Sequence, residues 1–354
     1  MKRILLPAIL MAVALLTSCN TTQKLYEAQE YDQVIMKVGH KASIGNVNLE
    51  EIEMLTSAYH RANQADHERI LQLKATGQPD VWSEVYERYK SMNGRQKVLA
   101  SLPKEVKSRI QFTQMNLDDE LQGAKNKAES YLVAKIHQLL PADTTADILQ
   151  AKKLTRQLTN VNPQNPHIIE YQLMALLRGA SQLRTEFADD HHFPISKRAE
   201  EALLRFDEDE LSRIPLGVSK ARIPVTMFVE ITDLMVTPNK DETATFKETT
   251  GNLTATVTDH ALTKSATMKA KLSFFYKDPD NMEPGGWNVL TLPEYEVTSR
   301  FNYTYSTVEG DRNACTEQTL ENVKRQAIPF PTDESMVMDA AREMNDLFAK
   351  TLAK

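Results

Sequence analysis

The stretch RIPVTMFVEI, residues 222–231, marks the point where the spacing of apolar residues changes from a helical to a strand period. Within it, apolar side chains at every second position alternate with a second set: Val225, Met227, Val229 and Ile231 against Thr226, Phe228 and Glu230. Alternation of this kind places the two sets on opposite faces of a β-strand. We therefore expect a half-buried strand that ends at Pro238.

Further strands are expected after this stretch. They are threonine-rich or alternating segments separated by turn residues: 243–247, 252–258, 265–276 and 287–292. The longest expected strand carries Tyr295, Val297, Ser299, Phe301, Tyr303 and Tyr305 on one face. Several strands in succession predict an antiparallel sheet or a small sandwich. A helix is expected to begin at Thr332-Asp333, with an apolar stripe formed by Val337, Ala340, Met344, Leu347 and Phe348.

Residues 20 to about 206 carry the helical period instead. Apolar side chains recur three and four positions apart, as in Ile52, Leu55, Ala58 and Tyr59. The last helix of this region is expected to run from Ile169 to Phe187, through Leu173, Leu176, Ala180 and Leu183. Asn-Pro turns between such segments favour stacked antiparallel helix pairs, each of which buries its stripe against the next.

Some of these helices resemble a known repeat. Residues 151–158, followed by Val161-Asn162-Pro163, are similar to the second helix and closing turn of a tetratricopeptide repeat, and residues 26–31 and 54–59 look like other fragments of it. The expected fold class is α+β: an N-terminal antiparallel helical-repeat domain, then an antiparallel β-sheet or sandwich domain with a C-terminal helix. The expected divisions are a leader at 1–18, the repeat domain at 19–206, a linker at 207–221 and the β-rich domain at 222–354.

The first residues have the order of a secretory signal. Lys2 and Arg3 precede 13 residues from Ile4 to Leu16 that form an apolar run, too short to span a bilayer, which needs about 20. The run closes in Leu16-Thr17-Ser18-Cys19, which resembles the lipobox of bacterial lipoproteins. The resemblance implies lipidation of the Cys19 thiol, cleavage before it and acylation of the new amino terminus. Asn20 and the absence of acidic residues at 21–24 resemble outer-membrane placement facing the periplasm.

The whole layout resembles a group of uncharacterised repeat-bearing lipoproteins from Gram-negative bacteria. The features that carry the resemblance are residues 58–63, Gly77 to Trp82, Gly310 to Ala314, and Phe330 to Glu334. In that group a helical half precedes a strand-rich half of unassigned activity, so the resemblance implies an architecture and no mechanism.

Composition excludes several classes of function. The net charge of −6, with both signs interspersed, is unsuited to nucleic-acid binding. Only 11 glycines are present, and no phosphate loop, Gly-x-Gly-x-x-Gly, Gly-x-Ser-x-Gly, His-Glu-x-x-His or Cys-x-x-Cys motif occurs. No cofactor is therefore expected. With Cys19 acylated, Cys315 is left without a partner, and we expect it to be a packed apolar residue rather than a reactive thiol.

Acidic and histidine clusters are the candidates for metal or acid–base chemistry. Asp189-Asp190-His191-His192 offers metal-ligand types, with His191 and His192 as the imidazoles, but adjacent residues converge poorly on one ion, so a solvated loop is the main interpretation. His60 and His67 are spaced to share a helical face and are interpreted as surface histidines. The run Asp207–Glu210 is interpreted as part of a charged linker, because consecutive carboxylates do not face one another across a cleft.

Aromatic residues give the one positive sign of recognition. Tyr295, Phe301, Tyr303 and Tyr305 on one strand face, with Trp287 near in sequence, are candidates for a platform that binds a peptide or a sugar. The alternative is that they form the inner face of the sheet.

Together these observations predict a lipid-anchored cell-envelope protein without enzymatic activity. It is expected to bind or scaffold a partner protein and to associate with the membrane through its N-terminal lipid. The alternatives are an envelope glycan-binding protein and a carbohydrate-active or metal-assisted hydrolase.

Overall fold

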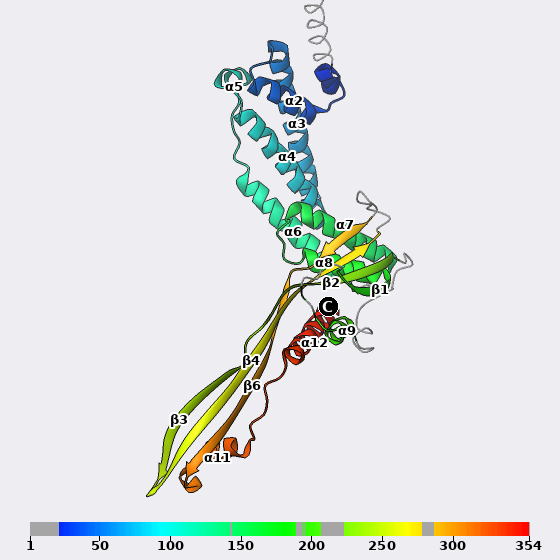
Figure 1. The fold of residues 1–354 in the computed structure, drawn as a ribbon. Helices are drawn as coiled ribbons and strands as arrows, with labels where there is room; N and C mark the ends of the chain where they lie inside the picture. The colour runs from blue at the N-terminus through cyan, green and yellow to red at the C-terminus, as the bar shows by residue number, and fades with distance from the viewer. Residues whose placement is uncertain are drawn as a thin grey trace, which may run out of the picture. The chain divides into compact units, whose positions relative to one another are not determined.

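The computed structural model describes residues 21–141, 144–188, 193, 195–206, 223–277 and 287–353 (Figure 1). The fold is mixed α+β, with helices in the N-terminal part and strands in the C-terminal part. The chain forms two compact units. Unit 1 comprises Met1–Gln138 with Lys153–Ile168, and unit 2 comprises Leu139–Lys152 with Ile169–Lys354.

Unit 1 is helical. After a helical turn at residues 21–27, its elements are α2 (Tyr31–Ser43), α3 (Leu49–Ala75), the short η1 (Pro79–Val81), α4 (Trp82–Ala100), α5 (Lys104–Ile110), α6 (Asp118–Leu139) and most of α7 (Thr145–Val161). Helix α3 begins with a capping box, in which the Asn48 side chain accepts from the Glu51 amide and the Glu51 carboxylate accepts from the Asn48 amide.

Two clusters of apolar side chains form the core of unit 1. One joins α2, α3, α4 and α5 through residues such as Val34, Leu55, Leu99 and Ile110, and the other joins α3, α4 and α6. In the second cluster Ile70 and Val85 are almost fully buried. The amphipathic stripes seen in the sequence therefore face one another, as the helical period predicts.

A buried arginine links three of these helices. The Arg95 side chain on α4 is 7% exposed and pairs with Asp32 at the start of α2, at 2.5 and 3.2 Å, and with Asp66 on α3 at 2.7 Å. Asp66 also pairs with Arg88 at 2.6 Å. Desolvation alone would lower the pKa of Arg95, but hydrogen bonds and charges from Asp32 and Asp66 raise it. The guanidinium therefore stays charged and fixes the register of α2, α3 and α4.

We predict that Arg95→Met destabilises unit 1 by about 3 kcal/mol, because it leaves the nearly buried Asp66 with one cation fewer. The matched control is Arg69→Met, which removes a half-exposed pair with Glu84 and should cost below about 1 kcal/mol. The chain holds two tryptophans, so in a Trp287→Phe background Trp82 fluorescence reports urea unfolding of unit 1 alone. Equal losses for the two variants would contradict the structural role of Arg95.

Unit 2 contains a mixed sheet. In chain order it has α8 (Ile168–Gly179), β1 (Ala180–Phe187), α9 (Lys197–Leu204), β2 (Ile223–Val236), β3 (Lys240–Thr250), β4 (Leu253–Tyr276), β5 (Asn288–Thr291), β6 (Tyr295–Gly310), η2 (Arg312–Ala314), α11 (Glu317–Lys324) and α12 (Asp333–Leu352). Strand β4 pairs antiparallel with β2 through residues 266–276, with β3 through 253–263, with β6 through 255–270 and with β5 through 273–276. Strands β2 and β3 therefore lie end to end along one edge of β4, and β6 lies along the other.

The predicted helix from Ile169 to Phe187 is wrong in its second half. Helix α8 ends at Gly179, and β1 then runs parallel to β2, with Leu183 opposite Val225 and Phe187 opposite Val229. Leu183 and Phe187 are four positions apart, a spacing that both a helix and a strand place on one face. The sheet is therefore mixed, where a purely antiparallel one was predicted. Residues 169–206, assigned from sequence to the helical domain, belong to unit 2 because β1 bonds to β2 and α9 packs on α12.

The sheet is covered on opposite faces at its two ends. From position 262 to 274 the buried residues of β4 are the even-numbered ones, and α12 and α9 pack over them. Near the start of β4 the buried residues are the odd-numbered Ala255 and Val257, which lie on the opposite face. Here η2 contacts β4 and α11 contacts β6. Helix α12 contributes Met344 and Phe348, which are fully buried and each worth about 2 kcal/mol, and Asn345 donates to the Leu203 carbonyl of α9 at 2.8 Å.

The C-terminal segment crosses the edge of β6 between these two faces. Arg325 donates to the Thr304 carbonyl at 3.2 Å, and the Tyr303 hydroxyl donates to the Gln326 carbonyl at 2.7 Å. Farther on, the nearly buried Lys264 donates to the Pro331 carbonyl at 2.8 Å and pairs with Asp333 at 2.6 Å. The predicted start of the last helix is confirmed, since Thr332 caps α12 by accepting from the Ser335 amide.

The turn that leaves β6 requires glycine. Gly310 has φ 106°, and a Cβ at this position would lie 2.7 Å from the Thr254 carbonyl oxygen. The next residue, Asp311, caps η2 by accepting from the Asn313 amide at 3.0 Å.

We predict that Gly310→Ala destabilises unit 2 by about 2 kcal/mol, because it adds a steric clash to an unfavourable φ. Gly251→Ala is the control: its φ of 61° is also positive, but nothing lies within 4 Å, so it should cost about 1 kcal/mol. Urea unfolding followed by Trp287 fluorescence in a Trp82→Phe background measures both. A Gly310→Ala variant no less stable than Gly251→Ala would show that the turn relaxes freely.

Candidate functional site

The structure brings together three of the predicted aromatic residues of β6. Phe301, Tyr303 and Tyr305 form a row of rings with centroids 6.4 Å apart at each step. Phe330 extends the row at one end, 6.1 Å from Phe301, and His260 of β4 extends it at the other, stacked on Tyr305 at 4.6 Å with the rings nearly parallel. This row lies on the sheet face that α12 covers farther along.

The other two predicted residues lie elsewhere. Tyr295 packs against Phe348 of α12 at 5.7 Å, and burial raises its phenolic pKa despite an opposing hydrogen bond with Thr351. Trp287 precedes β5, where it is 48% exposed with the Lys277 ammonium 4.9 Å from its ring. Tyr295 is therefore a core residue, as the inner-face alternative predicts, and Trp287 is separate from the row.

The C-terminal segment contacts the aromatic row at Phe301 and Tyr303. Phe301 is held under Phe330, and Tyr303 is tied to the Gln326 carbonyl. Beyond them Tyr305 and His260 are half-buried and flanked by exposed threonines. The His260 imidazole lies 3.3 Å from the Asp241 carboxylate on β3, so the ring is positioned from two sides.

Threonines surround the His260–Tyr305 pair on the same face. The register places Thr243 beside His260, and Thr245 beside Thr258 and Thr307 in the next row. The Thr245 and Thr258 hydroxyls are 3.1 Å apart. We call the set formed by Thr243, Thr245, Thr258, His260, Tyr305 and Thr307 the threonine–tyrosine face. It offers ring surface, hydroxyls and methyl groups side by side, with charged Asp241, Lys247 and Glu309 around it.

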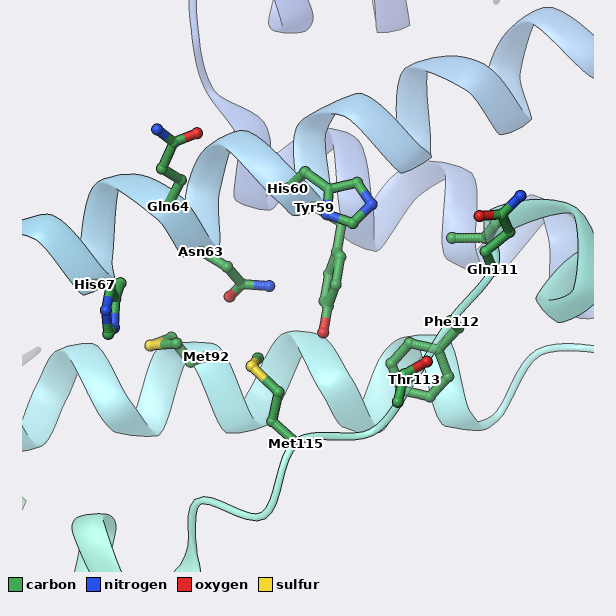
Figure 2. Close-up of a pocket in the computed structure, with 11 residues that line it drawn as sticks. Tyr59, His60, Asn63, Gln64, His67, Met92, Gln111, Phe112, Thr113 and Met115 are labelled. Carbon is green, nitrogen blue, oxygen red and sulfur yellow. The ribbon is translucent and has the colours of Figure 1, made fainter.

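A second candidate site is a pocket in unit 1, between α3, α4 and the chain that follows α5 (Figure 2). Its volume is about 540 Å³, and it is lined by Tyr59, His60, Asn63, Gln64, His67, Met92, Ile110, Gln111, Phe112, Thr113 and Met115. His60 and His67, which the sequence places on one helical face, both lie at this pocket. Its third wall could not be predicted from sequence, because residues 111–115 have no periodic pattern.

A left-handed residue, a hydrogen bond and a ring contact hold that third wall in place. Gln111 ends α5 in the left-handed conformation, with φ 52°, and directs the chain toward α4. The buried Gln96 side chain of α4 then accepts from the Met115 amide at 2.5 Å. Phe112 packs edge-on against Tyr59, with ring centroids 6.1 Å apart.

Cys315 lies at the end of η2, beside Glu248 of β3. It is partly buried, and desolvation together with the neighbouring Glu248 carboxylate raises its pKa. Glu248 accepts from the Thr316 amide at 2.7 Å and from the Thr319 hydroxyl at 2.8 Å, which ties β3 to the start of α11. Desolvation would raise the pKa of Glu248, but these bonds lower it, so it remains ionised beside the thiol.

Several predicted sites lie outside the described residues: Cys19, Asp189, Asp190, His191 and His192, and the run Asp207–Glu210. Among the residues that are described, no group of three or more His, Cys, Asp or Glu side chains is placed to hold a metal ion. Within the same part of the chain, no helix has the length and apolar character to cross a membrane.

The chain was compared with known families, curated proteins and solved structures. No family model matches it. No curated protein matches, and no solved structure does.

Proposed function

We propose that this chain is a lipid-anchored cell-envelope protein that binds a partner protein through the threonine–tyrosine face of unit 2. The observation that carries the proposal is the stacked His260–Tyr305 pair, which continues the aromatic row beyond Phe301 and Tyr303, the residues that contact Phe330 and Gln326. An aromatic pair held rigidly by its neighbours loses little conformational entropy on binding.

The arrangement of residues supports a protein as the partner. Tyrosine and histidine rings occupy the centre of the face and threonines surround them, while Asp241, Lys247 and Glu309 lie at its periphery. Protein interfaces commonly combine an aromatic centre with a polar rim. Sugar binding by the same rings is the alternative, and the experiment below separates the two.

The helical unit is proposed as a tetratricopeptide-like scaffold. The supporting features are the buried Leu154 and Leu158 of α7 and the Asn162-Pro163 turn that follows it. The side-chain amide nitrogens of Asn162 and Asn165 in this turn both donate to the Glu129 carboxylate of α6, at 2.9 and 2.7 Å. Stacked helices present extended surfaces for partners without any reacting group.

We propose Cys19 as the site of lipid attachment, on the pattern of residues 2–19. One acyl chain gives marginal membrane binding, whereas two or more give stable attachment. Placement at the outer membrane facing the periplasm is part of this proposal. Confinement near a membrane would raise the effective concentration of whatever the threonine–tyrosine face binds.

We expect a photo-crosslinking amino acid at Thr245 to capture one protein in cells, and Tyr305→Ala to reduce that product by about tenfold, as for an interface anchor. A crosslinker at Lys271, on the uncovered face opposite α12, should not capture it. Tyr86→Ala, a tyrosine truncation in unit 1, should leave the product unchanged.

Two results would overturn this proposal. One is a product that is insensitive to Tyr305→Ala. The other is tight binding of purified cell-wall polysaccharide that Tyr305→Ala abolishes, which would establish the glycan alternative instead.

For the anchor, we expect Cys19→Ser to move the protein from the membrane fraction to the soluble fraction and to abolish palmitate labelling. Cys315→Ser is the matched control, since it removes the other cysteine and should change neither result. Membrane association that survives Cys19→Ser would exclude the lipid as the anchor.

A further inference from the structure

We infer that the pocket of unit 1 binds a small neutral molecule with an apolar body and a carbonyl oxygen. The inference concerns residues that the proposed partner-binding face does not include. It rests on two neighbouring buried hydrogen-bond donors that face the pocket, the Tyr59 hydroxyl and the Asn63 side-chain amide nitrogen. Neither atom makes a hydrogen bond of good geometry to a described residue, although Asn63 lies close enough to lower the pKa of Tyr59.

Both side chains are more than nine-tenths buried. Tyr59 is 5% exposed and Asn63 is 8% exposed, and both come from α3 (Figure 2). A buried polar group without a hydrogen bond is costly, and such groups are rare in folded proteins. Two of them side by side at one pocket indicate a place where a bound molecule completes the hydrogen bonds.

Arg95 determines which way the Asn63 amide points. Its guanidinium donates to the Asn63 side-chain oxygen at 3.1 Å, and Arg95 itself is fixed by Asp32 and Asp66. Because the oxygen is engaged on that side, the NH₂ group is turned toward Tyr59 and the pocket (Figure 2). The site therefore presents a donor at Asn63 rather than an acceptor.

Tyr59 is a donor as well. Burial raises the pKa of its phenol, and the Asn63 amide and the Arg95 charge oppose this only in part. The hydroxyl therefore stays protonated at neutral pH. Two adjacent donors are suited to the two lone pairs of one carbonyl oxygen.

The walls select the rest of the ligand. Met92, Met115, Ile110 and Phe112 supply apolar surface, and the methionines can adjust to its shape. The residues that line this pocket include no Lys, Arg, Asp or Glu, so its lining offers an anionic ligand no lysine or arginine and a cationic ligand no carboxylate. A volume of about 540 Å³ is within the range of small-molecule sites.

The test uses N-(4-fluorophenyl)acetamide as a probe and fluorobenzene, which has the ring without the carbonyl, as the matched compound. Fluorine NMR of each compound with the full-length protein measures binding. We expect saturable binding of the amide and at least about fivefold weaker binding of fluorobenzene. Tyr59→Phe and Asn63→Leu should each weaken binding of the amide about fivefold or more. Tyr86→Phe, on α4, should leave it unchanged.

Thermal unfolding of Tyr59→Phe without probe separates binding from folding. Removal of a hydroxyl that has no partner should leave the Tm unchanged or raise it, although the same variant binds less amide. A lowered Tm would show that the hydroxyl is already satisfied in the free protein and would overturn the inference. Absence of saturable binding, or equal binding of the amide by the wild type and both pocket variants, would overturn it too.

Discussion

Backbone pairing along β4 is the constraint on which unit 2 depends. This strand of 24 residues bonds to β2, β3, β5 and β6, so the register of each is set against the same template. Each buried amide and carbonyl of the strand must find a partner. Changing its register by one residue would turn Met268, Leu272 and Phe274 away from α12. The position of the threonine–tyrosine face follows from this register, because only the observed pairing of β4 with β6 places His260 opposite Tyr305.

A second consequence of that register is the change of covered face along the sheet. Even-numbered residues of β4 are buried under α12, and Ala255 and Val257 are buried on the other side under η2 and α11. The connecting segment must therefore pass over an edge, and Arg325 and Tyr303 fasten it there.

Sequence periodicity predicts the elements better than their partners. The change of period at residues 222–231 and the stripe of α12 both have local causes, and the structure confirms them. Strand β1 was missed because Leu183 and Phe187 fit both periods. Trp287 is near the tyrosines of β6 in sequence, but the strand pairing separates them. Its neighbour Asn288 pairs with Tyr276 at the end of β4, whereas Tyr305 pairs with His260. The pocket depends on Asn63, whose orientation is set by Arg95, 32 residues away, and no local pattern records such a contact.

The charges of β3 have a consequence for self-association. Among the described residues this strand pairs only with β4, and its side chains are almost all exposed. An unpaired strand edge is a template for a second chain. Lys240, Asp241, Glu242, Lys247 and Glu248 give that edge mixed charge and a solvated surface. These charges therefore disfavour edge-to-edge pairing between copies of this chain, the contact from which fibrous aggregates grow.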